Sequence, residues 1–449
     1  MKKLLALLLA LSMLLSLAAC GSALPNDEPP VDEPASEEEE IVEEDPVEDG
    51  SADNTSGEDA AQDAAQDADD GSSEETAEDN DADIPLAIDT SCRVAMVTDV
   101  SGVDDRSFNQ TVYEACKGFC EANGLIFDYY QPANETTAQR ASAVELAIAD
   151  GFNVIVLPGR SFAETIVRLS GMYSDVKFVA IDVAADDILR ASVGESYDND
   201  PDNWNVTDYY NADNVSCVVF REELPGYMAG YAAVKLGYRH LGFLGGMTIP
   251  SVVRFGYGFV QGVNDAAKEL GIAGDVSVEY VYGGQFYGDA DITAYMDHWY
   301  RTLGVEAVFA CGGRIYTSAA EAAAKVGGKV IGVDTDQSPL IDLYGEGMTI
   351  TSAMKGLGPV VEEILYEIVT GSWENCAGRI ETLGLVSGED PAQNHVGLPM
   401  ETTQWSDSFT QEDYTALVGK LYSGEITVSD STTRLPALDI TLNEYGSIK

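Results

Sequence analysis

Three aspartates stand where a polar ligand could be bound, because each directly follows an apolar run that predicts a buried strand: Asp99, Asp182 and Asp334. Carboxylates accept strong hydrogen bonds from hydroxyl groups. The carboxyl ends of parallel strands are also where open α/β sheets bind their ligands. One such aspartate more often caps the following helix. Three of them, from both halves of the folded part, favour a site for a polyhydroxylated molecule.

Lys355 and two phenylalanines occupy similar positions. Lys355 also follows an apolar run, and its ammonium could join the ring of carboxylates or pair with Asp334. Phe108 and Phe286 follow strand ends, in loops or first helical turns. Each phenylalanine alone fits the core of a lobe equally well. Together they indicate two stacking walls for a planar ring.

The sequence lacks the motifs of nucleotide binding and of nucleophilic catalysis. The turns at Gly245-Gly246 and Gly312-Gly313 are without the Lys-Ser/Thr pair that holds phosphate and Mg²⁺. No Gly-x-Ser-x-Gly elbow occurs, and no histidine stands at a predicted strand end beside Ser or Cys. The pair Asp104-Asp105 could act as acid and base, but a helix-start or turn role is favoured. We therefore expect no catalytic residue and no cofactor.

The cysteines give no metal-ligand pattern. Beyond Cys20 they are Cys92, Cys116, Cys120, Cys217, Cys311 and Cys376, and their spacing matches no zinc motif. Cys116 and Cys120 lie one helical turn apart, with about 5–6 Å between Cβ atoms, which is too far for an easy disulfide. A metal pair there is the alternative, but three histidines leave few further ligands. We expect no metal site, and the sequence leaves the pairing of these six cysteines open.

From residue 93 onward, apolar strands alternate with amphipathic helices, which predicts parallel, doubly wound sheets. Ser107 could cap the first helix, and the polar stretch 184–214 predicts an inserted surface loop. The first half predicts strands at 94–97, 125–130, 154–157, 177–182 and 216–220, and helices at 108–123, 137–149, 161–170 and 224–235. The second half predicts strands at 240–244, 276–282, 305–310, 330–333 and 349–354, and helices at 256–270, 291–303, 316–325, 357–370 and 411–422.

Two consecutive units of this kind predict an α/β fold of two Rossmann-like lobes joined by a hinge. Lobe 1 is expected at 91–223, with a return near 356–395, and lobe 2 at 224–355 with part of 396–449. Their facing sheet edges would form one crevice for a small molecule. Hinged closure of the lobes is then expected.

The N-terminal 20 residues are typical of a targeting signal. A positive start, Met1-Lys2-Lys3, precedes an apolar run at 4–17, and small residues come directly before Cys20. This pattern resembles a bacterial lipoprotein signal, cleaved before Cys20 and acylated on its thiol and new amine; an ordinary secretory signal is the alternative. The run is shorter than the ~20 residues of a spanning helix. We expect a lipid anchor at Cys20 on the outer face of the cytoplasmic membrane.

Charge divides the rest of the chain. Residues 21–90 contain 27 Asp and Glu and no Lys or Arg. Such a segment buries too little apolar surface to fold, and its negative charges repel one another. We expect a disordered acidic tether. Residues 91–449 hold 50 acidic and 22 basic residues. That negative field makes nucleic acid and anionic lipid surfaces poor partners.

Several motifs follow one another between about residues 93 and 372: Val97-Thr98-Asp99-Val100, Asp104-Asp105-Arg106-Ser107-Phe108-Asn109-Gln110, Val218-Val219-Phe220-Arg221-Glu222-Glu223, Gly226 with Gly230, Gly242-Phe243-Leu244-Gly245-Gly246-Met247, Gly258-Phe259, Ile331-Gly332-Val333-Asp334-Thr335-Asp336-Gln337-Ser338 and Met354-Lys355-Gly356. In this order they resemble the basic membrane protein (BMP) family, the substrate-binding lipoproteins of ABC importers that include purine nucleoside receptors.

The resemblance implies a type I periplasmic-binding-protein fold that closes on a nucleoside. By position, Asp99 and Asn109 would hydrogen-bond the base, and Phe108 and Phe286 would sandwich it. Two further carboxylates would take ribose hydroxyls, with an ammonium beside them: Asp182, Asp334 and Lys355.

The expected function is capture of a nucleoside, with a purine favoured, by a monomer that delivers it to an ABC permease. A sugar or another small polar ligand is the runner-up. A sensory lipoprotein without a transport role and a nucleoside hydrolase are the other classes. The sequence leaves open the base preference, the identity of the permease and the role of 184–214.

Overall fold

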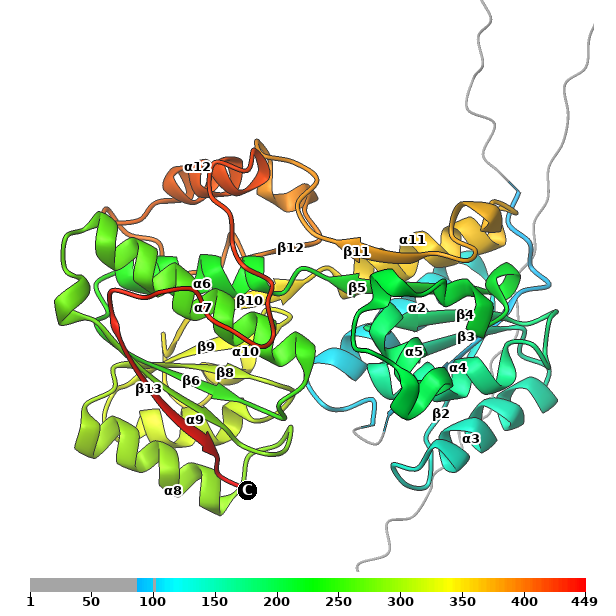
Figure 1. Cartoon of the computed structure of the whole chain (residues 1–449), viewed down its shortest axis with the longest axis horizontal. Helices are drawn as coiled ribbons and strands as arrows, with labels where there is room; N and C mark the ends of the chain where they lie inside the picture. The colour runs from blue at the N-terminus through cyan, green and yellow to red at the C-terminus, as the bar shows by residue number, and fades with distance from the viewer. Residues whose placement is uncertain (1–86, 100–101) are drawn as a thin grey trace, which may run out of the picture. The chain divides into compact units, whose positions relative to one another are not determined.

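The computed structural model describes residues 87–99 and 102–449. The predicted signal segment, Cys20 and nearly all of the acidic tether lie outside these residues. Two mostly parallel sheets, each with helices on both faces, make up the described part (Figure 1). We call the six-stranded sheet with its helices lobe 1 and the seven-stranded sheet with its helices lobe 2. The predicted α/β architecture of two doubly wound sheets is confirmed.

Lobe 1 has parallel strands in the order β11-β5-β4-β3-β1-β2. They are β1 (Arg93–Val97), β2 (Ile126–Tyr130), β3 (Val154–Pro158), β4 (Lys177–Ile181), β5 (Val215–Phe220) and β11 (Ile380–Leu383). Val94 and Met96 pack with α2 (Phe108–Asn123) and α11 (Leu357–Val369), while Ala95 and Val97 pack with α3 (Thr137–Ala149) and α4 (Ala163–Leu169). Because both faces are covered, the inner strands are apolar throughout.

Lobe 2 has the strand order β12-β10-β9-β8-β6-β7-β13, in which only the pair β10–β12 is antiparallel. Leu241 and Phe243 face α6 (Glu223–Lys235) and α7 (Pro250–Glu269), and Leu244 faces α8 (Ala290–His298) and α9 (Tyr316–Ala324). The strands are β6 (His240–Gly245), β7 (Ser277–Tyr282), β8 (Ala307–Cys311), β9 (Lys329–Asp334), β10 (Thr349–Lys355), β12 (Val396–Gly397) and β13 (Thr441–Ser447), and two further helices are α10 (Ser338–Ile341) and α12 (Gln411–Tyr422).

Three segments carry the chain between the lobes. They connect β5 to α6, β10 to α11, and β11 to β12. Crossovers of this kind are where a hinge absorbs the movement of two rigid bodies. Two polar residues discussed below lie at these crossovers, Glu222 at the first and Lys355 at the second.

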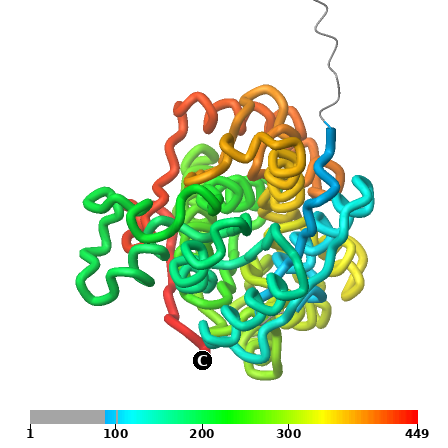
Figure 2. The backbone as a smooth tube through the Cα atoms, turned by 90° about the vertical axis from the view of Figure 1, so that its right-hand side faces the viewer, coloured from blue at the N-terminus to red at the C-terminus, as the bar shows by residue number. Residues whose placement is uncertain are grey.

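The stretch 184–214 differs from the expected surface loop. Its first part forms α5 (Ala185–Val193), which packs on α4 and buries Ile188 against the lobe 1 sheet. The helix escaped prediction because it has only nine residues and one buried turn. The part that follows is polar and largely exposed, and it projects from lobe 1 (Figure 2).

The C-terminal segment also differs from expectation. Residues 441–447 form β13, a parallel edge strand that pairs with β7. It is the red strand near the C-terminus in Figures 1 and 2. Its sequence, Thr-Leu-Asn-Glu-Tyr-Gly-Ser, has no apolar run, since an edge strand is held largely by main-chain pairing. The cysteines at 92, 116, 120, 217, 311 and 376 are all free. Within the described ranges, no helix combines the length and the apolar character needed to cross a membrane.

Candidate ligand-binding site

Asp182 and Asp334 occupy equivalent places in the two lobes. Asp182 directly follows β4, and Asp334 is the last residue of β9. Both have left-handed backbones, with φ of 61° and 65°. A non-glycine residue with positive φ is uncommon, and such conformations gather at functional sites. The repeated conformation therefore marks both strand ends as candidate ligand-binding positions.

Lys355 joins the first of these aspartates to the hinge. Its ammonium is buried at the end of β10 and lies 2.5 Å from Asp182 Oδ2 and 3.0 Å from Glu222 Oε1. Glu222 Oε1 has no hydrogen-bond partner in the described ranges. Its contact with the Lys355 ammonium is therefore an ion pair without hydrogen-bond geometry. Arg254 Nε holds the other Glu222 oxygen at 2.6 Å. Lys355 was expected either to join the ring of carboxylates or to pair with Asp334. It contacts Asp182, one of those carboxylates, and its ion-pair partners among the described residues do not include Asp334.

Burial and pairing oppose each other in this cluster. Burial raises the pKa of Asp182 to about 6, against the lowering effect of Lys355. Burial also raises the pKa of Asp334, and neither Lys355 nor the Ser107 hydroxyl fully offsets it. For Glu222, burial acts to raise the pKa, but Lys355 and Arg254 outweigh it and the pKa is lowered. Two carboxylates at the strand ends are thus poorly solvated and suited to accept hydrogen bonds from a ligand.

Asn109 and Asp99 form a second part of the site, at the start of α2. Asn109 Nδ2 donates to Asp99 Oδ1 at 3.1 Å and to Asp105 Oδ2 at 3.0 Å. Asp105 also accepts the backbone N–H groups of Ser107, Asn109 and Gln110. The helix-start role favoured for the Asp104-Asp105 pair is therefore confirmed for Asp105. The expectation that Ser107 caps this helix is wrong, because its side chain makes no capping bond.

Ser107 instead connects the two lobes. Its hydroxyl donates to Asp334 Oδ2 at 2.7 Å. Nearby, Gln337 Nε2 donates to the backbone oxygen of Arg106 at 3.3 Å. Both bonds join the loop before α2 in lobe 1 to the end of β9 and its following turn in lobe 2. In this structure the lobes thus touch at the predicted crevice.

The two predicted aromatic walls lie in different lobes. The Phe108 ring has the Lys355 ammonium 5.4 Å from its centroid. The Phe286 ring lies against two glycines, since a Cβ on Gly246 or Gly312 would come within 2.5 or 2.8 Å of its Cδ1 atom. Among the described residues, no ring contact joins Phe108 to Phe286. That they sandwich a base stays a prediction.

Three of the buried polar atoms that have no hydrogen-bond partner in the part of the chain that the structure describes lie near the strand ends of the lobe 1 sheet. They are Thr98 Oγ1, Asn109 Oδ1 and Asp182 Oδ1. Buried polar groups are nearly always hydrogen-bonded in folded proteins. These atoms come from the end of β1, the start of α2 and the end of β4, the same edge of one sheet. A polar ligand at this edge would supply the missing partners.

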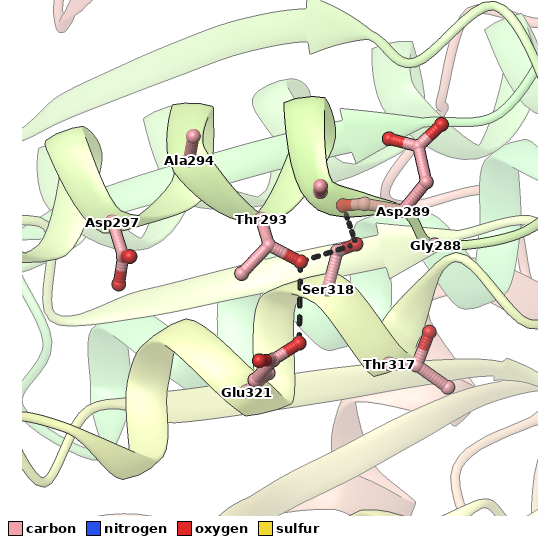
Figure 3. A pocket seen from close by; sticks show the side chains of 9 residues that line it. Gly288, Asp289, Thr293, Ala294, Asp297, Thr317, Ser318 and Glu321 are labelled. Carbon is pink, nitrogen blue, oxygen red and sulfur yellow. Dashed lines mark hydrogen bonds between the residues drawn. The ribbon is translucent and has the colours of Figure 1, made fainter. Parts of the chain in front are cut away.

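A separate cavity of about 400 Å³ lies between α8 and α9 (Figure 3). None of its lining residues is a predicted site residue. Thr293 donates to Ser318 and Glu321, and Ser318 donates to the backbone oxygen of Asp289. The polar side chains that line this cavity thus have hydrogen-bond partners within the protein, in contrast to the unpartnered atoms at the strand ends. Over 87–99 and 102–449, no group of His, Cys, Asp and Glu is arranged to hold a metal ion.

Sequence reasoning missed Glu222 and Arg254 as members of the site. Glu222 follows the apolar run of β5 almost as Asp182 follows β4, so the same strand-end rule could have found it. Arg254 lies inside α7 and has no such signal. Its role depends on how two helices pack, which a single sequence does not show.

Comparison with known proteins decides the family. A model described as ABC transporter substrate-binding protein PnrA-like, of the Bmp family, matches residues 92–431. The chain belongs to the Bmp family. The resemblance to basic membrane proteins is confirmed, and the family is one of substrate-binding proteins, not a class of enzymes.

Among similar proteins is the ABC transporter nucleoside-binding protein BmpA of Lactococcus lactis, 27% identical over 354 residues that cover 74% of this chain and 89% of BmpA. A protein of Pyrococcus abyssi named as a lipoprotein is 24% identical, covering 65% of this chain and 67% of its own length. An ABC transporter solute-binding protein of Aeropyrum pernix aligns with a TM-score of 0.54 at 23% identity, covering 75% of this chain and 87% of that structure. The last similarity confirms the periplasmic-binding-protein type of fold.

Proposed function

We propose that this Bmp-family protein captures a purine nucleoside between its lobes and delivers it to an ABC permease. The observation that carries the proposal is the pair of left-handed aspartates, one at a strand end of each lobe. Two carboxylates can accept hydrogen bonds from the 2′ and 3′ hydroxyls of a nucleoside's ribose. The similarity to a protein named as nucleoside-binding supports the same ligand class.

The proposed roles follow the positions of the side chains. Asp99 and Asn109 hydrogen-bond the base, and Asn109 Oδ1, which has no hydrogen-bond partner among the described residues, is the acceptor offered to an N–H group of the base. Phe108 and Phe286 stack on its faces. Two carboxylates take the ribose hydroxyls and one ammonium orients the first of them: Asp182, Asp334 and Lys355.

We further propose that Cys20 is acylated and holds the protein on the outer face of the cytoplasmic membrane, with 21–90 as a tether and the folded part acting as a monomer. The pattern before Cys20 and the similarity to a protein named as a lipoprotein support the anchor. Closure around the ligand would present both lobes together to the permease.

Titration calorimetry with adenosine, guanosine, inosine, uridine, ribose and arabinose tests the ligand. We expect one purine nucleoside per protein to bind, with ribose alone much weaker. Binding of ribose with no binding of nucleosides would overturn the stacking roles of Phe108 and Phe286 and favour the sugar-binding alternative. The matched control is Asp289→Asn in the α8–α9 cavity, which should leave nucleoside binding unchanged.

Two further measurements separate the remaining classes. Incubation with inosine should release no hypoxanthine, and release would indicate a hydrolase. Nucleoside uptake by cells that lack this protein should fall and be restored by its return. Restored binding at the cell surface without restored uptake would indicate a sensory lipoprotein.

A further inference from the structure

Four buried or partly buried charges form a continuous row across the hinge. Arg254 Nε lies 2.6 Å from Glu222 Oε2, Glu222 Oε1 lies 3.0 Å from Lys355 Nζ, and Lys355 Nζ lies 2.5 Å from Asp182 Oδ2. We call these residues the hinge charges. The row begins on α7 in lobe 2, passes both the β5–α6 and the β10–α11 crossovers, and ends at the β4 strand end of lobe 1.

The first two hinge charges are fixed by an unusually close pair of helices. A Cβ on Gly226 or Gly230 of α6 would overlap the backbone of Phe255 or Phe259 on α7. A Cβ on Gly258 or Gly262 of α7 would likewise overlap the backbone of Glu223 or Tyr227 on α6. The helices therefore touch backbone to backbone, and small shifts between them are sterically blocked. Glu222 precedes α6 and Arg254 is part of α7, so their spacing is set by this contact.

The last two hinge charges connect to the ligand site. Lys355 engages only Oδ2 of Asp182, and Asp182 Oδ1 is buried without a hydrogen-bond partner among the described residues. The ammonium also lies 5.4 Å from the Phe108 ring centroid and 5.6 Å from that of Phe255. A lysine has a long, flexible side chain with three donors. It needs a second anchor if it is to hold one carboxylate oxygen in a single orientation.

We propose that Glu222 and Arg254 are positioning residues for ligand binding: Arg254 fixes the Glu222 carboxylate, and Glu222 fixes the Lys355 ammonium so that Asp182 presents Oδ1 to the ligand. This inference rests on the proposed function, in which Asp182 is a ligand-binding residue. Glu222 and Arg254 touch no ligand themselves. Because Asp182 belongs to lobe 1 and Lys355 to lobe 2, the arrangement also makes the orientation of Asp182 depend on closure.

A double-mutant cycle tests the coupling. In the otherwise wild-type protein, Glu222→Gln should weaken inosine binding about tenfold, because Lys355 loses the anchor that orients Asp182. Arg254→Gln should weaken it less, since Arg254 acts through Glu222. In the Asp182→Asn background, Glu222→Gln should change inosine affinity less than about twofold. Equal effects of Glu222→Gln in both backgrounds would overturn the proposal.

Glu223→Gln is the matched control. Glu223 is a buried carboxyl next to Glu222, but it pairs with Arg221 at 2.8 Å and with none of the hinge charges. It should leave inosine affinity unchanged, and a loss equal to that of Glu222→Gln would show a merely structural effect and overturn the proposal.

A crystal structure of ligand-free Glu222→Gln provides a second test that needs no ligand. We expect Lys355 Nζ to leave hydrogen-bond distance of Asp182 Oδ2, and an unmoved Lys355 would overturn the positioning role. If wild-type protein binds no nucleoside, the proposed function fails, but this structure still decides the inference about Glu222.

Discussion

The strand-end aspartates of the two lobes have the same backbone conformation but different surroundings. Asp182 and Asp334 follow buried parallel strands and have φ values within a few degrees of each other. Asp182 is paired with the Lys355 ammonium from the opposite lobe. Asp334 accepts a bond from the neutral Ser107 hydroxyl, also from the opposite lobe. The doubly wound fold thus repeats the geometry, while the partner of each carboxylate comes from the facing lobe.

This difference shows how one fold builds an asymmetric site. Two identical carboxylates would hold a ligand without distinguishing its ends. Here one oxygen of Asp182 accepts from the charged Lys355 ammonium, whereas one oxygen of Asp334 accepts from the uncharged Ser107 hydroxyl. Both partners cross the crevice, so each carboxylate is fully oriented only when the lobes are closed. The two aspartates that we propose bind the ligand therefore also make contacts between the lobes.

The largest expected effect follows removal of the ammonium. Lys355→Met should lower the free energy of unfolding by about 3–5 kcal/mol, because breaking a buried ion pair leaves Asp182 without its charged partner and Glu222 with Arg254 alone. Urea denaturation at pH 7.5 measures this. The control Lys325→Met breaks a partly exposed pair with Asp297 and should cost no more than about 1 kcal/mol. Equal losses in the two variants would mean that Lys355 has no special place in the hinge.

Next in size is the contrast between the aspartates. Asp334→Asn should weaken nucleoside binding by about 2–4 kcal/mol, because a buried carboxylate with only a neutral partner is lost. Asp182→Asn should cost about 1–2 kcal/mol, since Lys355 already engages half of that carboxylate. Asparagine tolerates the left-handed backbone, so it tests charge rather than strain. Calorimetry giving the reverse order would contradict the assigned asymmetry.

Much of this geometry could be predicted from the sequence, because buried parallel strands are continuous apolar runs. The runs before Asp182, Asp334 and Lys355 placed all three at strand ends, and the structure has them there. β13 could not be found in this way, since its seven residues contain no apolar run and pair by main chain with β7. α5 was missed because it is short and lies in a stretch dominated by polar residues.

The partners of the predicted residues could not be derived from local patterns. Ser107 has the sequence context of a helix cap, yet Asp105 takes that role and frees the Ser107 hydroxyl for Asp334, 227 positions away. Arg254 meets Glu222 only because glycines let α6 and α7 touch. Strand ends are set by local sequence, but pairing across a crevice is set by how two lobes dock.

A smaller effect is expected from the contact that joins Asp334 to lobe 1. Ser107→Ala removes one hydrogen bond across the crevice and should weaken nucleoside binding by about 1 kcal/mol, or about fivefold. The ligand-free protein should also become more open, which small-angle X-ray scattering measures as a larger radius of gyration. The control Ser372→Ala changes a partly buried serine in the turn after α11, outside the crevice, and should alter neither quantity. Tighter binding by Ser107→Ala would mean that Ser107 competes with the ligand for Asp334.

The smallest expected effect is the pH dependence that Asp182 causes. This dependence has opposite signs for ligand affinity and for the stability of the folded protein. Burial raises the pKa of Asp182 to about 6, opposed by Lys355 and supported by the charges of Glu222 and Asp334. A ligand hydroxyl needs the ionised carboxylate, so affinity should fall about fourfold from pH 7.5 to 5.5. The folded-state pKa lies above the ordinary value of 3.8, so the stabilising contribution of this group is present below that value and is lost as the pH rises through about 6.

Ligand affinity and the stability of the ligand-free protein should therefore change in opposite directions as the pH rises from 4 to 7. Asp182→Asn should reduce both slopes, and what remains in the binding slope reports Asp334, whose pKa burial also raises. If the slopes of wild type and Asp182→Asn coincide, the carboxylate paired with Lys355 does not titrate in this range, and the two aspartates differ in partner but not in proton affinity.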